Sequence, residues 1–216
     1  MFNPHTARTV ALVLAILFTW APAGCQAPAP QAEPIPQPPA PAAGIEPADQ
    51  QAATDGGVIA WAADGVITPG EYQKNKSFGD FELHWTTDDL YLYMGMKAKT
   101  AGWVAVGFDP SSLMKDADIV QGFVKDGALS IADQYSTGQF GPHPADTQLG
   151  GTDDMLASGG KSDSGYTTIE FKRKLDTGDK YDKPLHKGSN KIIWAYGSDP
   201  QFTIKHFARG SGQIGL

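Results

Sequence analysis

Apolar and polar residues alternate with a period of two over several short stretches of the chain. In Leu90–Met96, leucines and methionines occupy every second position and tyrosines lie between the first of them. Because successive side chains of a strand point to opposite faces, this alternation predicts a half-buried strand. Phe81–Trp85 alternates in the same way, and the Asp88-Asp89 pair between the two segments suits a hairpin turn.

Further strand candidates follow along the chain. Gly102–Phe108 predicts a core strand, and Asp126-Gly127 marks a tight turn between two later segments. The remaining candidates are Ile119–Lys125, Leu129–Tyr135, Tyr166–Lys174, Lys191–Tyr196 and Phe202–Phe207. The sequence carries no long helical stripe and no internal repeat. Many short strands with Gly/Asp turns predict an all-β fold, an antiparallel β-sandwich.

The N-terminal residues follow a different pattern. Val10–Phe18 is a short apolar run with a positive charge before it and small residues after it, up to Cys25, the only cysteine. This order predicts an export signal over residues 1–24. Because the Ala-Gly-Cys sequence resembles the end of a lipobox, we expect Cys25 to be lipidated. Pro22 stands where such signals usually carry leucine, so a plain secretory signal or an uncleaved anchor stays open.

Residues 25–55 predict a disordered linker. Residues 26–55 contain eight prolines, many alanines and almost no large apolar side chain. Such a composition buries too little apolar surface to offset the entropy of ordering, and Pro-rich chain is stiff and extended. We therefore expect a spacer between a lipid anchor and one folded domain over residues 56–216. The expected location is the cell envelope, at the periplasmic or outer surface of a membrane.

Composition narrows the classes of function. From residue 56 onward, 16 Lys and Arg stand against 20 Asp and Glu without a basic stripe, so nucleic-acid binding is not expected. A single cysteine leaves no disulfide framework or thiolate metal site, and without C-x-x-C-H no c-type haem attaches covalently. The sequence also lacks G-x-S-x-G, P-loop and H-E-x-x-H motifs. We therefore expect a binding or carrier module without its own catalytic site.

Several phrases, in a fixed order, resemble one known family. They are Gly102–Phe108, Met114–Val120, Gly127, Ile131–Tyr135, Pro144–Asp146, Gly150–Gly151, Thr167–Arg173, Leu175–Asp179, Ile193–Gly197 and His206–Gly210. The series resembles a DOMON domain, and it is similar to the haem b-binding cytochrome domain of cellobiose dehydrogenases. The resemblance covers most of Asp80–Gly210 and implies an immunoglobulin-like β-sandwich of about ten or eleven strands.

The resemblance implies one of two functions. Some family members bind b-type haem and pass electrons, whereas others bind sugars or serve as interaction modules. In the haem type, a methionine shortly after the Gly-Trp strand and a histidine near the domain end hold the iron. Met114 and His206 stand at the matching positions. The resemblance thus implies non-covalent haem b, single-electron relay, and a partner oxidoreductase or membrane electron carrier.

Met114 and His206 also suit iron by their own chemistry. A thioether and an imidazole both bind haem iron, and a Met/His pair fills both axial positions, which favours electron transfer. We expect Met114 on a loop, His206 at a strand edge, and the porphyrin in a slot between the sheets. The expected walls are Trp103, Phe108, Trp194 and Tyr196, and the expected propionate partners are Lys205 and Arg209.

Other residues leave alternatives open. The rival iron ligands are His84, Met94, Met96, His143 and, in place of a histidine, Lys205. Calcium could bind two groups of acidic residues, Asp146, Asp153 and Asp154 in the first and Asp176, Asp179 and Asp182 in the second. Neither group has the spacing of an EF-hand, and turn chemistry explains both groups better, since Asp and Gly favour tight turns.

A sugar is the alternative ligand. Trp61, Tyr72 and Trp85 are aromatic residues that could stack on pyranose rings if they are exposed. The Glu71-Tyr72 region also resembles the opening of some carbohydrate-binding domains of the same broad superfamily. The alternative function is therefore a carbohydrate-binding or interaction module at the cell surface, without haem.

Overall fold

The computed structural model describes residues 60–216. These residues belong to one compact unit. The predicted signal peptide over residues 1–24, the predicted lipidation site Cys25 and the predicted linker over residues 25–55 lie outside the described residues. Within residues 60–216, no helix has the length and the apolar character needed to cross a membrane.

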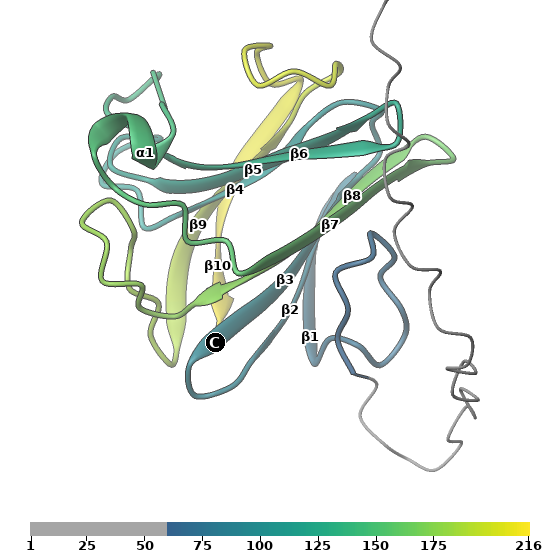
Figure 1. Ribbon diagram of the computed structural model, residues 1–216, viewed down its shortest axis with the longest axis horizontal. Coiled ribbons are helices and arrows are strands. Elements are labelled where there is room, and N and C mark those ends of the chain that lie inside the picture. Colours follow the sequence, from purple (N-terminus) through teal and green to yellow (C-terminus); the bar gives the residue numbers. More distant parts are fainter. Residues whose placement is uncertain (1–59) are drawn as a thin grey trace, which may run out of the picture. The chain divides into compact units, whose positions relative to one another are not determined.

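Ten strands of the described part form two five-stranded antiparallel sheets (Figure 1). The first sheet has the order β1 (Lys74–Phe78), β2 (Phe81–Thr87), β3 (Tyr91–Ala98), β8 (Tyr166–Lys174) and β7 (Ala157–Asp163). The second has the order β10 (Ala208–Gly215), β9 (Ser189–Tyr196), β4 (Val104–Phe108), β5 (Asp118–Lys125) and β6 (Ala128–Tyr135). One short helix, α1 (Asp146–Leu149), follows β6. The predicted all-β antiparallel sandwich is confirmed.

The main core lies between the two sheets and follows the predicted alternation. Leu92, Met94 and Met96 of β3 are fully buried there, as are Ile169 and Phe171 of β8. Because β3 and β8 are central in the first sheet, each has a hydrogen-bonded neighbour on both sides. Burial of a side chain of this size contributes about 1.5–3 kcal/mol each, so these strands anchor the sandwich.

The prediction of the last strand is wrong. Phe202–Phe207 belongs to the loop between β9 and β10, and the final strand is β10. β10 was missed because glycines stand where a strand would usually carry apolar residues. At Gly210 a larger residue does not fit, since an added Cβ atom would come within 2.5 Å of the Trp194 ring. Large side chains of neighbouring strands thus fill the space where an apolar residue of β10 would otherwise pack.

The second sheet is apolar on both faces, which positions the candidate site. Val104, Val106 and Phe108 of β4 pack into the main core. The opposite face carries a second apolar cluster, which includes Ala105 of β4, Ile119 and Phe123 of β5, and Ile193 and Ala195 of β9. We call this surface the outer face. The loop over residues 109–117 and the loop over residues 197–207 pack against it through Met114 and Phe202. The second of these loops is the yellow loop at the top of Figure 1.

Candidate functional site

A cavity of about 550 Å³ lies on the outer face of the second sheet. Its floor includes Ala105 and Gly107 of β4, Ile119 of β5, and Ile193 and Ala195 of β9, and its lining is mostly apolar. The prediction of a slot between the sheets is therefore wrong. The main core fills the space between the two sheets. The cavity lies outside this space, where the loops after β4 and after β9 border the outer face.

Met114 lines the cavity from the loop over residues 109–117. Hydrogen bonds hold this loop in place: the Ser111 N–H donates to the Lys115 carbonyl at 2.9 Å, and the Asp116 N–H donates to the Ser136 carbonyl at 2.8 Å. The Ser111 hydroxyl also donates to Asp116, and this bond lowers the pKa of the Asp116 carboxyl. The thioether of Met114 is thus presented by a loop with a defined backbone.

His206 lines the same cavity. It does not lie at a strand edge, as predicted, but in the loop over residues 197–207, two residues before β10. Trp103 fixes this loop, because its indole N–H donates to the Ile204 carbonyl at 2.9 Å. The structure therefore brings Met114 and His206 to one cavity from two separate loops.

The imidazole of His206 is suited to bind a metal. Burial, followed by the positive charge of Arg209, lowers the pKa of His206, so the ring is neutral at neutral pH. The guanidinium of Arg209 lies 3.3 Å from Nε2 of His206. Because a guanidinium only donates, Nε2 is the acceptor in this contact, and a metal bound at Nε2 would replace the contact with Arg209.

The other predicted residues divide into two groups. Trp103, Trp194 and Arg209 line the cavity. Phe108 and Tyr196 do not, because both side chains are buried in the main core on the opposite face of the sheet. Even-numbered positions of β4 and β9 face the core, which the aromatic character of Phe108 and Tyr196 alone did not reveal. Trp194 also packs against the main core, and it touches the cavity as well.

Lys205 is exposed and does not line the cavity. The second cation at the cavity is instead Lys191 of β9, which sequence reasoning missed. Its ammonium group lies 3.3 Å from the carboxylate of Asp109. Lys191, Ile193 and Ala195 are spaced two residues apart along β9, so their side chains point to the same face of the sheet. This spacing could have identified Lys191 from the sequence.

Gln121 of β5 is a second residue that sequence reasoning missed. It lines the cavity, it is 1% exposed, and its side-chain carbonyl oxygen accepts no hydrogen bond from the described residues. A buried acceptor without a partner costs free energy, so a donor from a ligand or from water fits at this position. Gln121 follows Ile119 with a spacing of two, which places both on the outer face.

The rival iron ligands differ in position. Met94 and Met96 are fully buried in the main core, away from this cavity. His84 lies on β2 in the first sheet, 3.1 Å from the carboxylate of Glu82. His143 does line the cavity, and its Nδ1 atom lies 3.2 Å from Oε1 of Gln134. His143 therefore stays a geometric alternative to His206.

The lining residues fit a haem group. Met114 and His206 supply a thioether and an imidazole, which are axial ligands of electron-transfer haems. The floor is bare backbone at Gly107, where an added Cβ atom would come within 2.8 Å of Ile193. An apolar wall with a few polar groups, here Arg209 and Lys191, is typical of cofactor sites.

The aromatic platform predicted for a sugar is not found in the described part of the chain. Trp85 is 4% exposed and belongs to the main core. The indole N–H of Trp61 donates to the Tyr72 hydroxyl at 2.8 Å, and that hydroxyl donates to Glu170 at 2.7 Å. These two aromatic side chains are half-buried and tie the segment before β1 to the first sheet.

Two solved structures resemble the described fold. The cytochrome b domain of pyranose dehydrogenase from Coprinopsis cinerea has a TM-score of 0.47 and 16% sequence identity, covering 63% of this chain and 76% of that chain. The cytochrome domain of Myriococcum thermophilum cellobiose dehydrogenase has a TM-score of 0.44 and 12% identity, covering 63% of this chain and 74% of that chain.

Relatives by sequence include DBH-like monooxygenase protein 1 of Mus musculus, which is 33% identical over 123 residues, 56% of this chain and 19% of the relative. The Homo sapiens protein of the same name is 30% identical over 120 residues, with the same coverage of 56% and 19%. The chain thus spans about a fifth of the length of these relatives. The DOMON domain model matches residues 76–197, more than half of the chain. On this match, the chain belongs to the DOMON domain family.

Proposed function

We propose that the chain binds haem b non-covalently in the outer-face cavity, with Met114 and His206 as axial ligands, and that it relays single electrons. One observation carries this proposal: the two residues lie in different loops and line one mostly apolar cavity. Haem supplies one-electron redox chemistry when bound. A Met/His pair leaves no open position on the iron, which favours electron relay over substrate chemistry and agrees with a module without its own catalytic site.

Residues around the pair have distinct roles in this proposal. Trp103 holds the histidine loop through its bond to Ile204, so the imidazole is oriented before any ligand binds. Arg209 and Lys191 supply positive charge at the cavity, where they can bind carboxylate groups of a ligand. The apolar floor of the cavity excludes water, which strengthens these electrostatic interactions.

Electron relay needs a partner, which we propose to be an oxidoreductase or a membrane electron carrier. Exposed apolar side chains lie near the cavity and support this: Phe140 is 78% exposed and Phe207 is 77% exposed. Phe140 follows Gln139 and Phe207 follows His206, and both of these residues line the cavity. We further propose that Cys25 carries the lipid anchor that keeps the protein at the cell envelope.

The test is the absorption spectrum of the purified full chain, produced with ample haem. We expect a sharp Soret band and split α and β bands, typical of six-coordinate low-spin haem. Met114→Ala and His206→Ala should each change these bands, because each removes one axial ligand. Met155→Ala and His186→Ala are matched controls, since neither residue lines the cavity, and both should leave the bands unchanged.

His143→Ala separates the two histidines. If His143→Ala alters the bands and His206→Ala does not, the ligand assignment is wrong. A colourless protein, or bands that survive both Met114→Ala and His206→Ala, contradicts haem binding in this cavity.

A carbohydrate-binding function is a second candidate, favoured by one further observation. A smaller cavity of about 330 Å³ on the first sheet is lined by polar groups that include Tyr72, Asn75 and Glu82. Such groups can bind sugar hydroxyls. A colourless protein that binds an oligosaccharide, and loses that binding in Asn75→Ala, would favour this candidate over haem.

A further inference from the structure

The acidic residues do not gather as their positions in the sequence indicated. Asp153 and Asp176 are exposed, and the carboxylate of Asp179 accepts hydrogen bonds from the backbone N–H groups of Thr152 and Tyr181. Asp182 is instead buried beside two aspartates from the second sheet, Asp118 of β5 and Asp133 of β6. One oxygen from each of these three side chains lies within 4.8 Å of the others.

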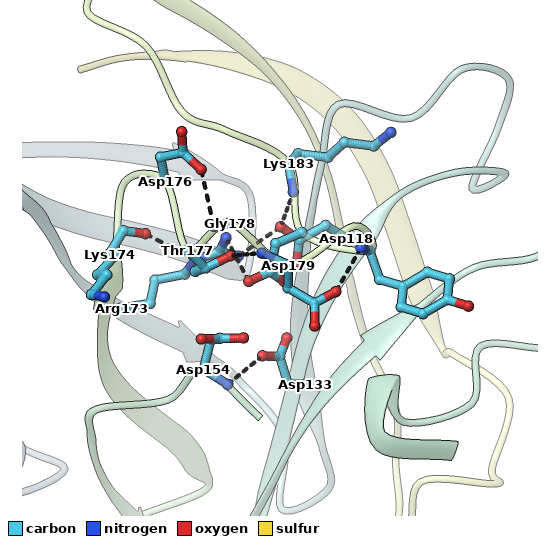
Figure 2. A network of polar contacts seen from close by, with 12 residues as sticks. Asp118, Asp133, Asp154, Arg173, Lys174, Asp176, Thr177, Gly178, Asp179 and Lys183 are labelled. Atoms are coloured by element: carbon cyan, nitrogen blue, oxygen red, sulfur yellow. Dashed lines mark hydrogen bonds and ion pairs between the residues drawn. The ribbon is translucent and has the colours of Figure 1, made fainter. Parts of the chain in front are cut away.

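We call Asp118, Asp133 and Asp182 the acidic cluster. Four of its six oxygens accept no hydrogen bond from residues 60–216: one each from Asp118 and Asp133, and both from Asp182. The remaining oxygen of Asp118 accepts from the backbone N–H of Lys183 at 2.9 Å and from the guanidinium of Arg173, and that of Asp133 accepts from the backbone N–H of Asp154 at 3.0 Å. Figure 2 shows these residues around the cluster. The cluster therefore combines carboxylates held by hydrogen bonds with oxygens that accept no hydrogen bond from the described residues.

Charge in the acidic cluster is not balanced by the protein. Arg173 of β8 is fully buried beside it, 2.6 Å from Asp118 and 3.4 Å from Asp182. When all three carboxylates are ionised, as a bound cation requires, they and the one guanidinium carry a net charge of −2, the charge that one divalent cation neutralises. Buried charges without such compensation are strongly disfavoured.

A fourth buried carboxylate adds to this imbalance. Asp146, in the first turn of α1, is 1% exposed, and neither of its oxygens has a hydrogen-bond partner in the described part of the chain. Burial, followed by the charges of Asp182 and Asp118, raises the pKa of Asp146 to about 7. Burial, followed by the charge of Asp182, likewise raises the pKa of Asp133 to about 8. These four carboxylates thus repel one another.

We propose that the acidic cluster binds a calcium ion, with Asp118, Asp133 and Asp182 as ligands and Asp146 as a further oxygen donor. Calcium takes six to eight oxygen ligands in flexible geometry, whereas magnesium keeps several waters and demands octahedral geometry. The absence of His and Cys from the cluster disfavours zinc and copper. The ion would join β5, β6, α1 and the segment after β8, independently of haem in the outer-face cavity.

The test uses the purified full chain, stripped of metal with a chelator. Titration calorimetry with calcium chloride should show one site, and calcium at a hundredfold of its Kd should raise the Tm by about 5–10 °C. Magnesium chloride at the same concentration should raise the Tm much less. An equal Tm in calcium and in chelator, with no heat of binding, overturns the proposal and indicates a cluster neutralised by protons alone.

Two isosteric variants assign the ligands. Asp133→Asn and Asp182→Asn should abolish the rise in Tm with calcium, yet remain folded in chelator by circular dichroism, because an amide has the shape of the carboxyl group and needs no buried charge. Asp153→Asn is the matched control: this side chain is exposed near the cluster, and the variant should keep the full response. A full calcium response in both Asp133→Asn and Asp182→Asn overturns the assignment, whatever the haem content of the sample.

Discussion

At the scale of single residues, the site depends on which face of a strand a side chain occupies. Phe108 and Gly107 are neighbours in sequence, yet Phe108 packs into the main core and Gly107 forms part of the cavity floor. The same alternation separates Trp103 from Val104. Ligand chemistry on the outer face can therefore vary without repacking the core.

Arg209→Gln should lower the reduction potential of the haem protein by on the order of tens of millivolts. The oxidised cofactor carries one more positive charge than the reduced one, and a guanidinium at the cavity disfavours that charge. Removing Arg209 therefore favours the oxidised form. Lys205→Gln is the matched control, because Lys205 is exposed and does not line the cavity. Potentiometric titration measures both, and an equal shift in the two variants would argue against a specific role for Arg209.

Tyr72→Phe should destabilise the fold by about 1–3 kcal/mol. The Tyr72 hydroxyl accepts from Trp61 and donates to Glu170, so its loss leaves a buried carboxylate with one partner fewer. Tyr166→Phe is the matched control: its ring lies on the surface of the same sheet, and the change should stay within about 0.5 kcal/mol. Denaturant unfolding measures both values, and equal losses would mean that the hydroxyl network carries no specific stabilisation.

At the scale of elements, three edge strands escaped prediction while the central strands did not. β1, β7 and β10 each border only one other strand. β1 exposes four of its five residues, and β10 contains three glycines, so neither displays an apolar alternation. Central strands bury every second side chain in the main core, so the sequences of β3 and β8 show the apolar alternation from which both strands were predicted. Met114 and His206 were predicted as ligands from the family resemblance. The position of the cavity on the outer face could not be predicted, because both faces of the second sheet are apolar and the strand pattern does not indicate which face a loop covers.

Glu170 of β8 links the first sheet to the segment before β1 and gives this element a pH dependence. It is fully buried, it accepts from the N–H groups of Asp64 and Gly65, and burial raises its pKa above the ordinary value of 4.5. Because the pKa of Glu170 is higher in the folded than in the unfolded chain, its protonated form contributes to the free energy of unfolding. This contribution is fully present below pH 4.5 and is lost as the pH rises through the pKa of the folded state.

Glu170→Gln should therefore gain stability relative to the unmodified chain as the pH rises above 4.5. The variant cannot ionise, so it does not carry the cost of a buried charge. Denaturant unfolding at about pH 4 and about pH 8 measures the difference in free energy of unfolding between the variant and the unmodified chain. A difference that stays constant with pH would show that Glu170 ionises as easily in the folded as in the unfolded chain.

At the scale of the whole molecule, the sandwich carries its two proposed sites in different places. The outer-face cavity, proposed to hold haem, lies on the second sheet, whereas the acidic cluster lies where β5 and β6 meet the segment after β8. The main core separates the outer face from the first sheet. This arrangement lets the core determine stability while the loops over residues 109–117 and 197–207 determine ligand binding.

Haem should stabilise the whole domain, because only the folded chain presents both loops to one cavity. At a free haem concentration of a hundredfold its Kd, linkage adds about 2.7 kcal/mol, which raises the Tm by about 5–10 °C. Differential scanning calorimetry of the haem-loaded and haem-free protein measures this shift. Met114→Ala should reduce it, and an equal Tm for the two forms would contradict a specific haem site.

The identity of the axial ligands is the central claim, and near-infrared magnetic circular dichroism of the oxidised protein tests it most directly. Iron(III) bound by a thioether and an imidazole gives a charge-transfer band at a different energy from iron(III) bound by two imidazoles. We expect the methionine–histidine band in the unmodified chain and its loss in Met114→Ala. A bis-histidine band, from His206 together with His143, or no haem signal, would contradict the account.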